Sequence, residues 1–104
     1  MANEAAALIE RSGPGVLHVR SDLTFASVTS VLVHSRPLLN ADGGRLVIDL
    51  ADVTRADSAG LALLLEWLRM TRAKGAEILF RHVPEQLMAI ARASDLERLI
   101  PLEG

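Results

Sequence analysis

The chain has 104 residues, of which 50% are apolar, a net charge of -2 at neutral pH and no cysteine. One packed domain over residues 1–104 is therefore expected, and disorder, a disulfide framework and thiol catalysis are excluded. The small negative charge gives no electrostatic basis for binding nucleic acid or an anionic membrane surface. Without a signal peptide pattern or an apolar run of the roughly 18–20 residues that cross a bilayer, a soluble cytoplasmic protein is predicted.

The N-terminal part is predicted to form a β-hairpin. Gly-Pro-Gly at 13–15 is a strong turn signal, so residues 5–10 and 16–20 are expected to be the two arms. The first arm is rich in alanine, and a helix is the alternative there.

A helix is expected next, beginning near Phe25. Asp22 and Thr24 offer caps for it, and Pro37 should end or kink it. Residues 41–44, Ala-Asp-Gly-Gly, then form a turn. The apolar side chains expected on the inner side of this helix are Phe25, Val28, Val31, Leu32 and Leu39.

The central stretch, residues 46–67, is the most informative. The short, β-branched run at 46–50 is typical of a strand buried on both faces of a parallel or mixed sheet. The loop at 54–60 then delivers Asp57 and Ser58 to the N-terminus of a helix. Such a terminus has unpaired N–H groups and a partial positive charge, which favour capping oxygens and anions.

The helix after Ser58 carries two apolar stripes. The side chains expected to face the sheet share one arc: Leu61, Leu64, Leu65 and Leu68. Leu63, Trp67 and Met70 lie nearly opposite. Either neighbouring helices cover this second stripe, or it is a docking surface, for which Trp and Met are typical anchors. Two stripes also make self-association an alternative when no partner is present.

The C-terminal third is predicted to contain a strand and two helices. Gly75 ends the central helix, and residues 77–80 form a short strand. Pro84 fits the first turn of a helix, and residues 94–97 match a capping box for a last short helix. The order strand, strand, helix, strand, helix, strand, helix, helix predicts an α/β fold, with a mixed sheet of about four strands and helices packed against it.

Catalysis by Ser58 is not expected. Strand, serine and helix follow one another as in a nucleophile elbow, but alanine stands at the first glycine position of G-x-S-x-G. The candidate bases are His18, His34 and His82, and none has a visible orienting partner. A chain this short also leaves little room for a substrate pocket. We therefore expect a protein that is not an enzyme.

Metal and nucleotide sites are also not expected. Asp49, Asp52 and Asp57 do not have the spacing of an EF-hand or zinc site, and neither G-x-x-x-x-G-K-[ST] nor G-x-G-x-x-G occurs. No metal and no cofactor are predicted. A small anion at the helix terminus beside Ser58 is an alternative that these patterns leave open.

The signature of the central stretch resembles that of a known family. Asp49-Leu50, Val53 and the run Asp-Ser-Ala-Gly-Leu-Ala-Leu-Leu at 57–64 are similar to STAS domains, the family that contains the anti-sigma factor antagonists. There the loop before the second helix follows the pattern D-[ST]-[SAT]-G-L. The resemblance extends over about residues 6–102 and implies a single STAS domain.

Within this family, residues 57–69, DSAGLALLLEWLR, are most similar to MlaB-type proteins. These are the STAS subunits of the Mla ABC transporter, which maintains lipid asymmetry in Gram-negative outer membranes. The resemblance implies a non-catalytic cytoplasmic subunit that binds the MlaF-like ATPase, and through it the permease, at the inner membrane without inserting into it. The partner-binding residues it implies are Asp57, Ser58, Ala59 and Gly60. The second apolar stripe is compatible with this, because Leu63, Trp67 and Met70 could supply the apolar centre of such an interface.

The alternative within the family is an anti-sigma factor antagonist that is regulated by phosphorylation of Ser58. In that branch the serine at this position is the kinase target, although a second glycine usually stands where this chain has Ala62. A phosphate adds a charge of about −1.5 to −2 and three acceptors, enough to break a close-packed contact. Asp57 beside it would oppose that charge. A simple N-cap is a third role for Ser58.

Overall fold

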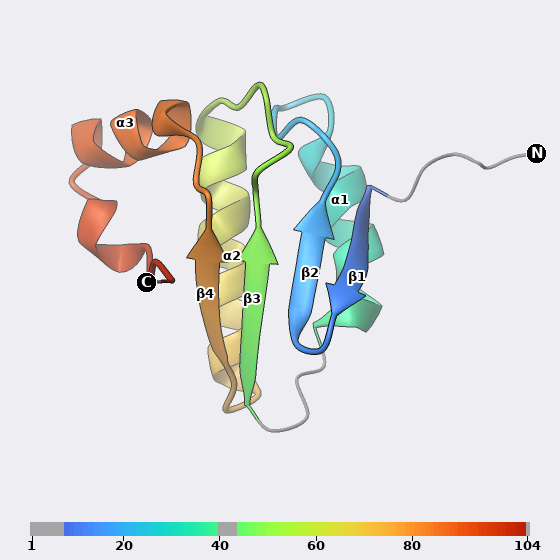
Figure 1. Ribbon diagram of the computed structural model, residues 1–104. Coiled ribbons are helices and arrows are strands. Elements are labelled where there is room, and N and C mark those ends of the chain that lie inside the picture. Colours follow the sequence, from blue (N-terminus) through green and yellow to red (C-terminus); the bar gives the residue numbers. More distant parts are fainter. Residues whose placement is uncertain (1–7, 40–43, 104) are drawn as a thin grey trace, which may run out of the picture.

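The computed structural model describes residues 8–39 and 44–103 (Figure 1). They form a mixed sheet of four strands in the order β1-β2-β3-β4, in which the first pair is antiparallel and the other two are parallel. The strands are β1 (Ile9–Gly13), β2 (Val16–Val19), β3 (Arg45–Asp49) and β4 (Glu77–Arg81). The predicted α/β fold and its order of elements are confirmed.

The two long connections between parallel strands pass along one face of the sheet. Figure 1 shows α1 behind β1 and β2 and α2 behind β3 and β4, and none of the helices in residues 8–39 and 44–103 lies over the face turned to the viewer. No helix in the described part of the chain is long and apolar enough to span a bilayer. The helical elements are α1 (Val28–Ser35), η1 (Arg36–Leu38), α2 (Ser58–Ala73), α3 (Glu85–Ala93) and η2 (Glu97–Leu99).

The core lies between the sheet and these helices. Alternate strand side chains point to the helices and are almost completely buried: Leu17, Val19, Leu46, Ile48, Ile78 and Phe80. In β3, Val47 on the other face is also buried, in agreement with the apolar run of the sequence. The open face carries paired charges, including Arg45 with Glu77 at 3.0 Å. The sheet can therefore face solvent on one side.

The outer edge of β4 is covered by the C-terminal residues. The Phe80 N–H donates to Pro101 O at 2.8 Å, and the Glu103 N–H donates to Phe80 O at 2.9 Å. Arg81 and Glu103 also form an ion pair with an N–O distance of 2.6 Å. The tail therefore satisfies backbone groups that an edge strand would leave unpaired.

Both apolar stripes of α2 are used inside the domain. Trp67 is fully buried, its Nε1–H donates to the Oγ of buried Ser35 at 2.8 Å, and its ring stacks on Phe80 with centroids 6.5 Å apart. Leu63 is buried as well, and Met70 is packed against the core. Coverage of the second stripe by neighbouring elements is thus confirmed, and the expectation that Trp67 forms a docking surface is wrong.

The start of α1 differs from the prediction. The helix begins at Val28 rather than near Phe25, which lies in a turn and is 78% exposed. Leu23 forms an isolated parallel bridge with Ala56, and this extended pairing delays the helix. Asp22 does not cap the helix. Its end is as expected, because the α-helical part stops before Pro37 and continues as the 3-10 turn η1.

The N-terminal hairpin forms as predicted, whereas the last helix starts differently. The hairpin is confirmed, and its first arm is a strand from Ile9 onwards, while residues 5–7 and most of the turn at 41–44 lie outside the described residues. The capping box at 94–97 is wrong. Ser94 instead ends α3, where its N–H donates to Ile90 O at 3.1 Å, and η2 has no side-chain cap.

Gly60 allows the first turn of α2 to lie directly against the backbone of Leu23. A Cβ atom at Gly60 would be 2.5 Å from Leu23 O and 3.0 Å from Leu23 Cβ. Neither atom is the end of a flexible side chain, so any side chain at this position would push the two segments apart. Gly60 is therefore a packing residue of the domain, and its predicted role as a partner contact is not supported because it is buried.

We expect Gly60→Ala to lower the free energy of unfolding by about 1–3 kcal/mol, the usual cost of overpacking. This would occur although alanine favours an α-helix over glycine by about 1 kcal/mol. Urea denaturation followed by circular dichroism measures the difference. The control is Gly13→Ala, where a Cβ would meet no atom within 4 Å. Equal stabilities of the two variants would contradict the packing role.

Candidate partner-binding site at the start of α2

The loop before α2 is held from two sides. On one side, the Leu23 N–H donates to Arg55 O at 2.9 Å, and the Asp57 N–H donates to Leu23 O at 3.1 Å. On the other side, the Ala56 N–H donates to Oε1 of Gln86 in α3 at 3.0 Å. The signature loop therefore has a fixed position between the segment before α1 and the start of α3.

Asp57 is the N-cap of α2. Its Oδ1 accepts the Ala59 N–H at 2.8 Å, and its Oδ2 accepts the Phe25 N–H at 3.1 Å. The first bond satisfies one of the free N–H groups of the helix end, and the second fixes the turn before α1. Because Asp57 occupies the cap position, the capping role considered for Ser58 is wrong.

Ser58 is the first residue of α2 and its side chain is exposed. Its hydroxyl makes no hydrogen bond with any residue that the structure describes, so it is available to an external group. It opens onto a shallow depression of about 660 Å³, here called the α1–α2 groove. The residues that line the groove are Phe25, Val28, Thr29, Leu32, Ser58, Ala59, Ala62, Leu63 and Glu66.

The lining of the groove is mostly apolar and carries no unpaired charge. Glu66 accepts hydrogen bonds from Arg69 at 2.6 and 3.0 Å, and this guanidinium holds the pKa of the Glu66 carboxyl below its usual range. No histidine lines the groove, and Ser58 has no base as a hydrogen-bond partner in the described part of the chain. The arrangement offers an apolar contact surface on which the hydroxyls of Ser58 and Thr29 have no hydrogen-bond partner among the described residues.

Some of the predicted partner-binding residues lie at the groove, and others are buried in the core. Ser58, Ala59 and Leu63 line the groove, and Asp57 positions it. Trp67 lies in the core, as described above. Phe25 was missed as a surface residue, because its spacing from the other apolar residues of the helix indicated an inward side chain. No signal in the sequence pattern distinguishes it.

A second polar cluster lies where β2, β3 and β4 end. His18, Asp49 and Arg81 are register neighbours on the three strands. His18 Nε2 is 2.7 Å from Asp52 Oδ2, and His82 Nδ1 is 3.1 Å from Asp49 Oδ1. His34 Nδ1 is also 2.7 Å from the backbone oxygen of Ser30. The expectation that the histidines lack orienting partners is therefore wrong for all three. Within the described ranges, no group of His, Cys, Asp and Glu side chains is arranged to hold a metal.

Asp49 is the centre of this cluster. Burial raises its pKa, but this is outweighed by hydrogen bonds from His82 and from the Ala51 N–H, and by the nearby charges of His82 and His18. The pKa of Asp49 is consequently below its ordinary value of 3.8. A carboxyl with a lowered pKa in the folded state stabilises the fold at pH values above its unfolded pKa, and this contribution is lost as the pH falls through the folded pKa.

We expect the stability of the parent to fall more steeply than that of Asp49→Asn as the pH is lowered below about 4, because asparagine does not titrate. At neutral pH the variant should be the less stable of the two. Urea denaturation at a series of pH values gives both quantities. The control is Asp95→Asn, since Asp95 is exposed and has no ion pair or hydrogen bond from its side chain within the described residues. Parallel acid profiles for parent and Asp49→Asn would contradict the assignment.

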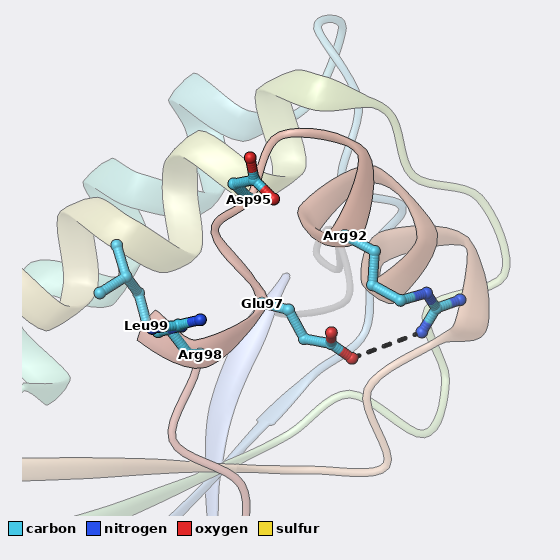
Figure 2. Close-up of a pocket in the computed structure, with 5 residues that line it drawn as sticks. All are labelled: Arg92, Asp95, Glu97, Arg98 and Leu99. Atoms are coloured by element: carbon cyan, nitrogen blue, oxygen red, sulfur yellow. Dashed lines mark ion pairs between the residues drawn. The ribbon is translucent and has the colours of Figure 1, made fainter.

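Another depression, of about 580 Å³, lies beside α3 and η2. Figure 2 shows Glu97 directed towards Arg92, with Arg98 and Leu99 away from this pair. Nη1 of Arg92 is 3.6 Å from Oε2 of Glu97, and Arg92 also forms an ion pair with Glu85. Because Arg92 and Glu97 are paired with one another, we interpret this depression as solvated surface between α3 and the C-terminal residues. The α1–α2 groove therefore remains the candidate site.

The family comparison matches residues 7–101 with a model described as Mlab, STAS domain. A comparison with curated proteins finds no relative of the sequence. Solved structures with the same fold include one assigned as an anti-sigma factor antagonist from Thermotoga maritima. It has a TM-score of 0.72 and 16% sequence identity, over 88% of this chain and 81% of that chain.

Two further structures are similar to the chain. The anti-sigma factor antagonist SpoIIAA in its unphosphorylated form has a TM-score of 0.67 and 13% identity, over 92% of this chain and 86% of that chain. The murine anion transporter Slc26a9 has a TM-score of 0.62 and 19% identity, over 85% of this chain but 14% of the transporter. At these identities the likenesses show a common fold.

Proposed function

Because the chain belongs to the Mlab-type STAS domain family, we propose that it is a non-catalytic cytoplasmic subunit that binds the ATPase of an ABC phospholipid transporter. It would support the assembly or activity of that ATPase, and it would meet the permease only through it, at the inner membrane. The observation that carries this proposal is the α1–α2 groove, which combines an apolar lining with the free hydroxyl of Ser58.

The composition of the groove favours a protein partner. Ala59 and Ala62 are small, so a partner side chain or helix can approach α2 closely along its first turns. Ser58 can donate or accept a hydrogen bond across such an interface. A largely apolar centre with few polar groups is typical of protein–protein interfaces.

We expect Ser58→Asp to weaken binding of the purified ATPase subunit by at least tenfold, a loss of about 1.4 kcal/mol. The change places a charge in a contact that would exclude water. It should leave the fold intact, since a carboxylate at the N-terminus of a helix is electrostatically favourable. Isothermal titration calorimetry measures the affinity.

The matched control is Ser12→Asp, which introduces the same charge at an exposed position of β1. Equal affinities of parent, Ser58→Asp and Ser12→Asp would show that the ATPase does not contact Ser58. Trp67→Ala is unsuitable for this test, because the residue is buried and its removal would act through stability.

A second candidate function is supported by the exposure of Ser58. A hydroxyl that is free and on the surface is accessible to a kinase, as the anti-sigma factor antagonist alternative requires. A phosphate there would be close to the carboxylate of Asp57, which caps the same helix end. Intact-mass analysis after incubation with a cognate anti-sigma kinase and ATP separates the two candidates. A gain of one phosphate supports the phosphorylated switch, and an unchanged mass supports the contact role.

A further inference from the structure

Phe25 is the most exposed large apolar side chain in the described part of the chain, at 78%. Burial of a phenylalanine side chain is favourable, so leaving this ring in water has a cost. Its neighbour Leu23 is fully buried, so the local chain does reach the core. The ring of Phe25 is not part of the core of the domain.

The backbone of Phe25 is nevertheless held in place. Its N–H donates to Oδ2 of Asp57 at 3.1 Å. The segment around it is also fixed, because Leu23 pairs with the loop before α2, and the Thr24 N–H before Phe25 donates to Oγ of Ser27 after it at 3.0 Å. An exposed aromatic ring on a fixed backbone loses little conformational freedom on binding, which is the property of an interface anchor.

The position of Phe25 connects it with Ser58. Both line the α1–α2 groove, Phe25 from the turn before α1 and Ser58 from the first turn of α2. The carboxylate of Asp57 joins the two, since it caps α2 with one oxygen and holds Phe25 with the other. The acidic residue of the signature therefore fixes the backbone of Phe25 relative to the first turn of α2, which carries Ser58.

The charge of the groove selects the kind of occupant. Glu66, the ionisable residue among those lining it, is already paired with Arg69. A groove whose lining residues include no cation gives no attraction for an anionic headgroup or a nucleic acid, and its mostly apolar lining matches an apolar protein surface. Ala59 and Ala62 have small side chains, so the exposed ring of Phe25 protrudes beside them at the α1–α2 groove.

We propose that Phe25 is the anchor of the interface with the ATPase subunit and enters an apolar pocket of that protein, and that Asp57 is the residue that positions it. This inference rests on the function proposed above and adds to it the residue that supplies most of the affinity. It also defines the partner surface as uncharged, with a pocket of aromatic size beside the contact to Ser58.

Phe25→Ala tests the anchor. The variant should bind the purified ATPase subunit at least about 30-fold more weakly than the parent in calorimetry, as is usual for the central residue of an interface. Its stability in urea should be unchanged, because the ring is exposed. The matched control is Val33→Ala on α1, since Val33 is also exposed, at 54%, but does not line the groove. It should bind within about twofold of the parent.

A double-mutant cycle tests the positioning role of Asp57. If Asp57 acts through Phe25, Asp57→Ala should weaken binding strongly in the parent and much less in the Phe25→Ala background. A role of Asp57 confined to the stability of α2 would give the same loss in both backgrounds and would overturn the positioning role. Thermal denaturation followed by circular dichroism identifies a temperature at which all variants are folded.

The outcomes separate this inference from the proposed function. If the parent binds the ATPase and Phe25→Ala binds equally well, the anchor is wrong while the proposed function stands. A parent that does not bind the ATPase overturns both. Analytical sedimentation tests whether a second copy of the chain, rather than the ATPase, occupies the groove. A parent that self-associates, combined with a monomeric Phe25→Ala variant of unchanged ATPase affinity, would assign the groove to a second copy of the chain and overturn the proposal.

Discussion

The carboxylate of Asp57 connects two segments that are 32 residues apart in the chain. With one oxygen it caps α2, and with the other it holds the turn that leads into α1. The backbone pairing of Leu23 with Arg55 and Asp57 extends the same connection. The relative position of the two helices at this end, and with it the shape of the groove between them, depends on these few bonds.

The packing around this connection limits which parts of α2 can face a partner. Gly60 lies against the backbone of Leu23, and Trp67 is enclosed by Ser35 and Phe80. Gly60 and Trp67 of the signature helix are therefore both occupied by contacts within the domain. A partner can therefore meet the first turn of α2 and the side chains of the groove, whereas Trp67 of the second apolar stripe serves the stability of the fold.

Much of the fold follows from local signals in the sequence. The Gly-Pro-Gly turn, the apolar run of β3 and Gly75 at the end of α2 act over a few residues, and the elements they predict are present. The start of α1 could not be predicted in this way, because it depends on the pairing of Leu23 with a loop far along the chain. The carboxylate partners of His18 and His82 likewise depend on the register of parallel strands.

In the candidate site, too, some features follow from local sequence and others depend on contacts between distant segments. The position of Ser58 at the start of a helix follows from the sequence of the loop. Whether an apolar residue of a helix points inwards depends on what covers it, and periodicity alone cannot supply this. Hence Trp67 was considered for the surface and is buried, while Phe25 was expected in the core and is exposed.

The tail that pairs with β4 has a consequence for solubility. Exposed strand edges are templates on which further strands of other molecules can add, and this is a common route to aggregation. The bond that Phe80 N–H donates to Pro101 O and the bond that Phe80 O accepts from Glu103 N–H occupy part of that edge, and the pairing of Arg81 with Glu103 adds charge beside it. At the opposite edge, the irregular register between Arg11 and Gly13 interrupts β1. Both borders of the sheet are thus poor substrates for fibril growth, although one of its faces has no helix over it.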